Sequence, residues 1–366
     1  YGAYGLVLGL NYSENNAFGT GRRIALGINN SAWRTSYFFD FGEPYFTIDG
    51  VSRGYSVYFR ESDYGEYNIA SYTSDSFGAG IQFGIPISEI ERVGINFNYD
   101  NTRIDTGSMP ASQILEFTSS EGSDFEVLKS QFVWSRVTLN RGIFPTAGQS
   151  QALAFQVTVP GSSLTYARVT YRHRYYKPIF GGNFIIGLRG EVGALEAYGD
   201  TRIPPFFEHF YSGGINSVRG YKQNTLGPRA TPSLYYLDGE GNQVLDEFGN
   251  PLFNPYSYRD DRSIGGAYLI EGGFDLIFKL PFLQDQRSVR TSMFIDVGNV
   301  FAQDCGDTLI NINCSELDIK ELRYSIGVGV TWITQLGPMS LAIASPGNKG
   351  PLDETEGFQF EIGTQF

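Results

Sequence analysis

The chain of 366 residues contains few of several residue types, and each scarcity excludes a class of protein. Only two histidines are present, which leaves little material for general acid–base catalysis. No apolar run approaches the roughly 18 residues that a membrane-spanning helix needs, so a helical membrane protein is excluded. The net charge of −12 is opposite to the basic surface that nucleic-acid binding requires, so no nucleic-acid partner is expected.

Cysteine is also scarce, with Cys305 and Cys314 as the two examples. They lie in a polar, turn-rich stretch, where we expect a disulfide across a loop. Such a bond indicates an oxidising compartment. The alternative is a pair of unpaired, buried thiols.

Glycine and aromatic residues are abundant, with 45 glycines, 24 tyrosines and 29 phenylalanines. The mean hydropathy is −0.20, a value typical of a soluble protein. A large soluble all-β protein fits this composition. An outer-membrane barrel fits it as well, because an apolar lipid face and a polar lumen average to a neutral value.

Alternation of apolar and polar residues with a period of two dominates the chain, and no convincing amphipathic helix is found. Val93, Ile95 and Phe97, for example, alternate with Gly94 and Asn96. The apolar positions are large, whereas the others are mostly Gly, Ser, Thr, Asn and Gln instead of the Lys and Glu of an open surface. A wet, enclosed lumen explains this second face better than the surface of a soluble sandwich does.

Fifteen segments combine this pattern with about the length that a tilted membrane-spanning strand requires. We predict strands at 4–13, 22–30, 34–43, 51–61, 73–85, 92–103, 127–140, 150–159, 164–177, 183–197, 266–280, 288–301, 321–334, 338–345 and 357–366. Because single-chain bacterial barrels have an even number of strands, we expect a sixteenth strand, the first, to be missing upstream. Residues 1–10 also lack the basic segment and cleavage pattern of a signal peptide, as a mature fragment would.

The connections between the predicted strands alternate between short and long. Long polar loops are expected at 104–126, 199–265 and 302–320, whereas the turns on the other side are short, as at Gly19 and Gly50. Outer-membrane barrels have short periplasmic turns and long extracellular loops. We therefore predict that residues 1–366 form one all-β domain, a transmembrane antiparallel β-barrel.

The longest loop, 199–265, contains the glycine-rich stretch Tyr211–Tyr221 and one central arginine, Arg219. By strand parity, Asp275 and Asp296 on the two following strands both face the lumen. A loop folded back into the pore would place Arg219 between these carboxylates, in a charge-assisted pairing. The alternative is that Arg219 is a solvated loop residue and the aspartates are ordinary lumen charges.

Several short motifs carry a family resemblance by their order and spacing. They are Val218-Arg-Gly-Tyr221, Asn224-Thr-Leu-Gly-Pro228, Phe294-Ile-Asp-Val-Gly298, Leu336-Gly-Pro338 and Phe358-Gln-Phe-Glu-Ile-Gly363. Over its whole length the chain resembles the BamA family of outer-membrane assembly factors and its wider superfamily of assembly and secretion barrels. This resemblance implies a 16-stranded barrel preceded by periplasmic POTRA domains, which are not in this sequence.

The resemblance also implies roles for individual residues. It implies that Val218, Arg219, Gly220 and Tyr221 form a loop-to-lumen clasp with Asp296 and Asp275, with Glu271 as the runner-up for Asp275. It implies that the last strand carries a terminal aromatic signal at Phe358, Phe360 and Phe366. Ile362 continues the apolar face of that strand, and Gly363 is expected to weaken it.

The function implied is insertion of unfolded outer-membrane proteins into the outer-membrane lipid, through a lateral seam between the first and last strands. Client strands would add to the seam by β-augmentation, and accessory lipoproteins would bind the upstream domains. The alternatives are a two-partner-secretion transporter of the same superfamily and a passive porin. We expect no enzyme activity, no cofactor and no metal site.

Overall fold

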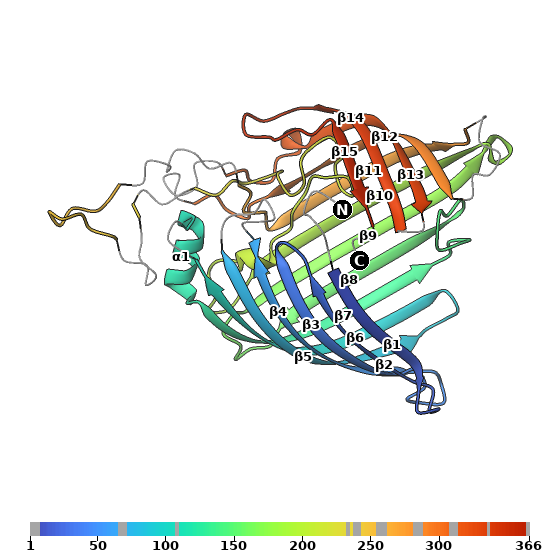
Figure 1. The fold of residues 1–366 in the computed structure, drawn as a ribbon, viewed down its shortest axis with the longest axis horizontal. Coiled ribbons are helices and arrows are strands. Elements are labelled where there is room, and N and C mark those ends of the chain that lie inside the picture. Colours follow the sequence, from blue (N-terminus) through green and yellow to red (C-terminus); the bar gives the residue numbers. More distant parts are fainter. Residues whose placement is uncertain are drawn as a thin grey trace.

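The computed structural model describes residues 8–64, 72–106, 110–231, 235–236, 243–253, 262–280, 288–306, 314–334 and 337–363. These residues form one curved sheet of fifteen strands, with the first strands in blue and the last in red at its two margins (Figure 1). No helix among them is long and apolar enough to span a membrane.

The strands follow one another along the chain with short helical turns between some of them. The strands are β1 (Leu8–Ala17), β2 (Arg22–Asn30), β3 (Arg34–Glu43), β4 (Ser52–Asp63), β5 (Thr73–Pro86), β6 (Glu91–Asp105), β7 (Asp124–Val137), β8 (Gly148–Thr158), β9 (Tyr166–Ile179), β10 (Phe184–Ala197), β11 (Tyr268–Phe278), β12 (Val289–Phe301), β13 (Arg323–Thr334), β14 (Gly337–Gly347) and β15 (Phe358–Ile362). The helical segments are α1 (Ser112–Glu121), η2 (Phe180–Gly182), η3 (Phe206–Glu208) and η4 (Ile319–Glu321).

Every strand pairs antiparallel with its neighbour in sequence, so the order of the sheet is the order of the chain. Among the described residues, β1 pairs with β2 alone and β15 with β14 alone. The β9–β10 ladder joins fourteen residue pairs, whereas the β14–β15 ladder joins five, from Met339–Ile362 to Ile343–Phe358. The last strand is therefore held by an unusually short ladder.

The prediction of an all-β fold with fifteen strands in this sequence is confirmed. The largest shifts are at β1, predicted at 4–13, at β7, predicted at 127–140, and at the end of β15, which was predicted at 357–366 and ends at Ile362. β1 continues beyond residue 13 through a run of polar residues that the alternation does not mark. The predicted sixteenth strand and Phe366 lie outside the described residues.

The two faces of the sheet differ in the way that the alternation predicts. On β12 the side chains of Met293, Ile295 and Val297 point outward and are 53%, 48% and 37% exposed, whereas Asp296 between them is 0% exposed. Apolar side chains are similarly exposed on the outward face of the other strands, as at Tyr37, Phe39, Val57, Phe59, Phe77, Phe97, Phe132, Phe155, Leu188, Val192, Ile326, Val328, Phe358 and Phe360. A continuous apolar outer surface of this kind suits contact with lipid.

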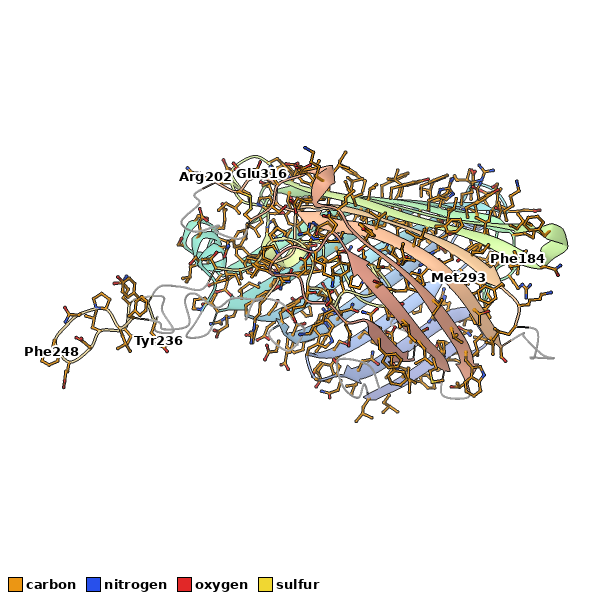
Figure 2. The ribbon with its side chains drawn as sticks, turned by 90° about the horizontal axis from the view of Figure 1, so that it is seen from above. Phe184, Arg202, Tyr236, Phe248, Met293 and Glu316 are labelled. Atoms are coloured by element: carbon orange, nitrogen blue, oxygen red, sulfur yellow. A yellow bond between two sulfur atoms is a disulfide. The ribbon has the colours of Figure 1, made fainter. Side chains whose placement is uncertain are left out.

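The long connections all leave the same end of the sheet, where α1 and the described parts of the loop between β10 and β11 also lie (Figure 1). The hairpin at 243–253 projects furthest from this end, with Phe248 at its tip (Figure 2). A hydrophobic cluster closes the same end, and in it Phe117 packs edge-on against Phe206 with ring centroids 5.3 Å apart. The apolar core is thus a cap under the long loops.

Helix α1 was not predicted from the sequence. It has no side-chain hydrogen bond at its N-cap, so the usual start signal is missing. Only two of its ten residues, Ile114 and Phe117, are buried, so the sequence shows little of the helical repeat of apolar residues. The helix is stabilised because these two side chains pack into the hydrophobic cluster under the long loops.

Candidate functional site

The stretch Tyr211–Tyr221 turns sharply, because three of its glycines adopt backbone conformations that other residues rarely take. The φ angles of Gly213, Gly214 and Gly220 are 101°, 103° and 91°. A side chain at Gly220 would also place its Cβ 2.9 Å from the Cβ of Ala344 on β14. The turn therefore brings the loop backbone into close contact with the inner face of the sheet.

Arg219 lies at this turn and binds two carboxylates at once. Its Nε donates to Asp296 Oδ2 at 2.6 Å, and its Nη2 donates to Asp296 Oδ1 at 2.8 Å and to Asp275 Oδ1 at 3.1 Å. The backbone N–H of Arg219 donates to Asp296 Oδ2 at 3.2 Å. The guanidinium also stacks over the ring of Phe294, with 3.5 Å between Cζ and the ring centroid. The structure thus brings together the three residues that strand parity and the resemblance had paired.

Burial makes these pairings strong. Burial by itself would lower the pKa of Arg219, but the hydrogen bonds and the charges of Asp296 and Asp275 raise it above its ordinary value. The guanidinium is therefore charged. A lysine could not make the planar two-pronged contact with Asp296.

A second arginine shares Asp296. Arg189 on β10 places Nη2 2.6 Å from Asp296 Oδ1 and donates from Nη1 to the carbonyl of Asn216 at 3.0 Å. We call Arg219, Asp296, Asp275 and Arg189 the arginine clasp. Its two cations balance its two anions, which satisfies the requirement that buried charges be paired.

Glu271, the runner-up for a partner of Arg219, contacts a different residue of the loop. Its carboxylate accepts a hydrogen bond from the hydroxyl of Ser217. Ser217 also accepts from the backbone N–H of Gly213 at 2.9 Å. Glu271 therefore fixes the start of the turn, while Asp275 and Asp296 fix its middle.

The other members of the motif contact further strands. Val218 is 1% exposed and packs against Gly298 of β12, where a Cβ would approach its Cγ2 to 3.0 Å. Tyr221 is buried, and its hydroxyl donates to the carbonyl of Gly347 on β14. Each residue of Val218–Tyr221 thus has its own partner on the inner face.

Gln359 on the last strand is a site residue that sequence reasoning missed. Its Oε1 accepts from the backbone N–H of Gly220 at 2.9 Å, and its Nε2 donates to the carbonyl of Tyr221 at 2.7 Å. Its side chain is 3% exposed. The alternation places Gln359 on the inner face, but nothing in the sequence points to a particular partner.

The terminal residues singled out by the resemblance lie around Gln359. Phe358 and Phe360 point outward and are 60% and 40% exposed. Ile362 ends β15, and Gly363 follows it with φ of 99°. β15 thus ends at the residue before this turn, and the expected weakening of the strand by Gly363 stays a prediction.

A second anchor of the same loop lies on the opposite part of the sheet and was also missed. Lys129 on β7 places Nζ 2.7 Å from Glu208 in η3 and 2.9 Å from Asp100 on β6. Burial would raise the pKa of Glu208, but the charges of Lys129 and Arg168 hold it below its ordinary value. The loop is therefore fastened to two separated sets of strands.

His209 follows Glu208 and is half-buried beside the cap. Burial lowers its pKa to about 4, although its hydrogen bond with the carbonyl of Ile264 acts in the opposite direction. The 2.9 Å contact from Nδ1 to that carbonyl means that Nδ1 carries the proton. His209 is thus neutral at ordinary pH and packs at the base of the loop.

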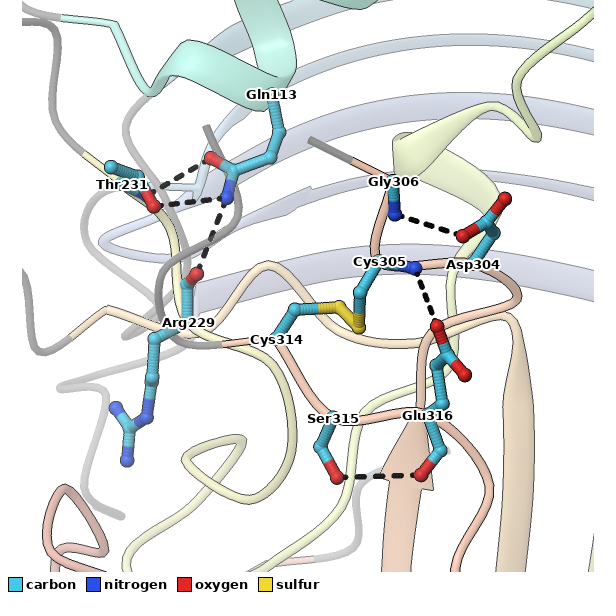
Figure 3. Close-up of a disulfide and its surroundings, with 9 residues drawn as sticks. All are labelled: Gln113, Arg229, Thr231, Asp304, Cys305, Gly306, Cys314, Ser315 and Glu316. Atoms are coloured by element: carbon cyan, nitrogen blue, oxygen red, sulfur yellow. Dashed lines mark hydrogen bonds between the residues drawn. A yellow bond between two sulfur atoms is a disulfide. The ribbon is translucent and has the colours of Figure 1, made fainter. Parts of the chain in front are cut away.

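The predicted disulfide between Cys305 and Cys314 is present, in the connection between β12 and β13 (Figure 3). Glu316 accepts from the backbone N–H of Cys305 at 3.1 Å. Within the described part of the chain, no cluster of three or more His, Cys, Asp or Glu side chains could hold a metal ion.

The apolar outer face, the antiparallel sheet and the loop that returns to its inner face define a transmembrane β-barrel with an internally fastened loop. A family model for the Omp85 superfamily domain matches residues 16–366. The chain belongs to this superfamily, and the resemblance inferred from its motifs is confirmed.

Individual relatives agree with this assignment. The outer membrane protein assembly factor BamA of Neisseria meningitidis serogroup B is 33% identical over 99% of this chain and 45% of its own length. The crystal structure of BamA from Haemophilus ducreyi lacking POTRA domains 1–3 matches with a TM-score of 0.81 and 26% identity, over 98% of this chain and 70% of that one. CdiB from Acinetobacter baumannii has a TM-score of 0.53 at 12% identity, over 97% of this chain and 56% of that one, a likeness of fold.

The chain spans under half of the length of three curated assembly factors that it matches.

Proposed function

We propose that this chain is the membrane barrel of an outer-membrane protein assembly factor, and that client strands add at the seam between its first and last strands. The observation that carries this proposal is the five-pair ladder that holds β15. The proposal places the long loops outside the cell and the short turns in the periplasm, where upstream domains would recruit accessory lipoproteins. It requires no bond-making chemistry.

The physics of strand edges supports this role. A strand edge presents unpaired N–H and C=O groups, and in lipid each unpaired group is expensive. A client strand that pairs with such an edge satisfies these groups by β-augmentation. The seam would therefore lower the barrier to insertion without acting as a chemical site.

The length of β15 adds a second effect. Five residues rise roughly 17 Å at the usual spacing of a strand, compared with an apolar band of about 25 Å in outer-membrane barrels. A bilayer thins to match a short apolar surface. Thinning beside β15 would further ease the entry of client strands.

The proposal is tested by photo-crosslinking in the full-length protein in its membrane. A crosslinker at Phe358 or Phe360 should capture the last strand of a client during its assembly. Phe132 on β7 is a matched control, because it is an outward-facing phenylalanine with 41% exposure far from β15 in the sheet order. Equal capture at all three positions, or none at Phe358 and Phe360, would contradict the proposal.

A second candidate is a transporter that secretes one dedicated partner, which the likeness of fold to CdiB favours. Transport through the lumen would require the loop to leave its two anchors. Single-channel recording separates a passive porin from the assembly barrel: we expect small, irregular conductance for a barrel that keeps its loop, and a large, steady one for the porin. Secretion of a single partner with normal assembly of other barrels would support the transporter.

A further inference from the structure

The last strand is bonded to the loop as well as to the sheet. The side-chain amide of Gln359 accepts from Gly220 and donates to Tyr221, so it bonds to both ends of one stretch of loop backbone. An amide can do this because it has both a donor and an acceptor, whereas a carboxylate only accepts. The loop backbone thus lies against the inner face of β15, held there by one side chain.

Further bonds join the loop to the segment that leads into β15. Asn216 Nδ2 donates to Glu361 Oε2 at 2.9 Å. The backbone N–H of Glu356 donates to the carbonyl of Gly220 at 2.9 Å, and that of Lys222 donates to the carbonyl of Glu354 at 2.9 Å. The strand and its approach are therefore bonded to the loop at several successive points.

A buried arginine reinforces the same contact. Arg229 is 2% exposed, and its Nη2 donates to the carbonyl of Leu352 at 2.6 Å. Its Nη1 lies 3.6 Å from Glu354. Lys222 reaches the same carboxylate at 2.7 Å.

The arginine clasp and the Gln359 contact are adjacent in the loop. Arg219 binds β11 and β12, and the next residue, Gly220, binds β15. Gly220 itself lies close to β14, where a Cβ added to it would be 2.9 Å from the Cβ of Ala344. Because Arg219 and Gly220 are consecutive, we expect a displacement of Arg219 from its carboxylates to move the backbone N–H that bonds Gln359.

We propose that Gln359 is a positioning residue through which the loop sets the pairing of the last strand, so that release of the arginine clasp frees β15 at the seam. The inference rests on the proposed function for its meaning, because the seam is where client strands would add. The inference states that two contacts of neighbouring loop residues are coupled: that of Arg219 with Asp296 and that of Gly220 with Gln359.

The test is hydrogen–deuterium exchange of the full-length protein in lipid nanodiscs, read on peptides that cover 352–363. In Gln359→Leu, exchange in this segment should rise about tenfold, the factor expected for the net loss of one or two hydrogen bonds. Exchange in β7 should not change. Gln131→Leu is the matched control, because Gln131 is also an inward glutamine that bonds across strands, to Asn96 at 2.9 Å, on a distant part of the sheet.

The coupling needs a second arm. Arg219→Lys should raise exchange in 352–363 as well, although it changes no atom that contacts β15 directly. The double variant should exchange no faster than the faster single variant, because the first change already breaks the shared connection. If Gln359→Leu does not fold, Gln359→Glu keeps the shape and the acceptor, loses the bond donated to Tyr221, and should also raise exchange in 352–363.

Three results would overturn the inference: unchanged exchange in 352–363, a rise spread evenly over all strands, or effects of the two substitutions that simply add. These readouts use only the folded protein and no client. A failure here would therefore leave the crosslinking test intact, and absence of client crosslinks would leave the coupling intact.

Discussion

Arg219 and Asp296 form a two-pronged ion pair in which the carboxylate has no exposure to solvent and the guanidinium has 12%. The two residues are 77 positions apart in the chain. Their contact fixes the loop on β12 at the point where the loop backbone also reaches β15. Four expected outcomes follow from this and the neighbouring contacts.

Arg219→Ala should destabilise the folded barrel by about 3 kcal/mol, because removal of one partner leaves a buried charge under-compensated. Because Arg189 still contacts Asp296 in this variant, we expect the loss of stability to lie near the lower end of the range for a broken buried ion pair. The measurement is the temperature at which the folded band on a gel converts to the unfolded one. Arg172→Ala is the control. Arg172 also pairs with a carboxylate, that of Glu191, but its side chain is 65% exposed, so this substitution should change the conversion temperature little.

Gly220→Ala should cost more than Gly249→Ala. Both residues have positive φ, 91° and 80°, so both substitutions carry the backbone strain of about 1 kcal/mol or more. A Cβ at Gly249 meets nothing within 4 Å, whereas one at Gly220 meets Ala344 at 2.9 Å. Equal melting profiles for the two variants would show that the close contact with β14 does not constrain the loop.

Acidification should loosen the cap through His209. Its pKa is lowered to about 4 in the folded protein, against an ordinary 6.5 when unfolded. Between these values the unfolded state binds more protons, so stability falls as the pH decreases through this window. From pH 7 to pH 5 the loss from this one group is about 2 kcal/mol.

The measurement compares the unfolding midpoints of wild type and His209→Gln at the two pH values. The substitution should remove most of this loss, while the contribution of titrating carboxylates remains in both proteins. An identical pH dependence in the two proteins would mean that His209 is not the group responsible.

Loss of the disulfide should lower the stability of the end of the barrel that carries the long loops, without loosening β15 at the seam. Cys305→Ser with Cys314→Ser removes a constraint worth about 2–3 kcal/mol on the chain-entropy account. Neither cysteine has a bond to the clasp or to β15 among the described contacts. Gel melting should therefore fall, while hydrogen exchange in 352–363 stays at the wild-type rate. A faster rate in that segment would contradict this separation.

The strands could be predicted because a two-residue period records which side chain meets lipid and which meets water, and that record is local. The same parity placed Asp275 and Asp296 on the inner face. The contacts of Gln359 and of Lys129 with the loop could not be predicted, because they depend on where an irregular segment lies in space. Helix α1 was not predicted for a related reason: its two buried side chains pack against residues distant in the chain, and the helix's own sequence carries little sign of those contacts.

The bond between Gly220 and Gln359 joins residues 139 positions apart. Contacts of such long range form slowly, because the intervening chain must lose much of its freedom before they can close. The sheet can grow strand by strand through neighbours, but this bond waits for all of β11 to β15 to be in place. Docking of the loop against Gln359 can therefore be completed only once the last strand of the sheet is in place.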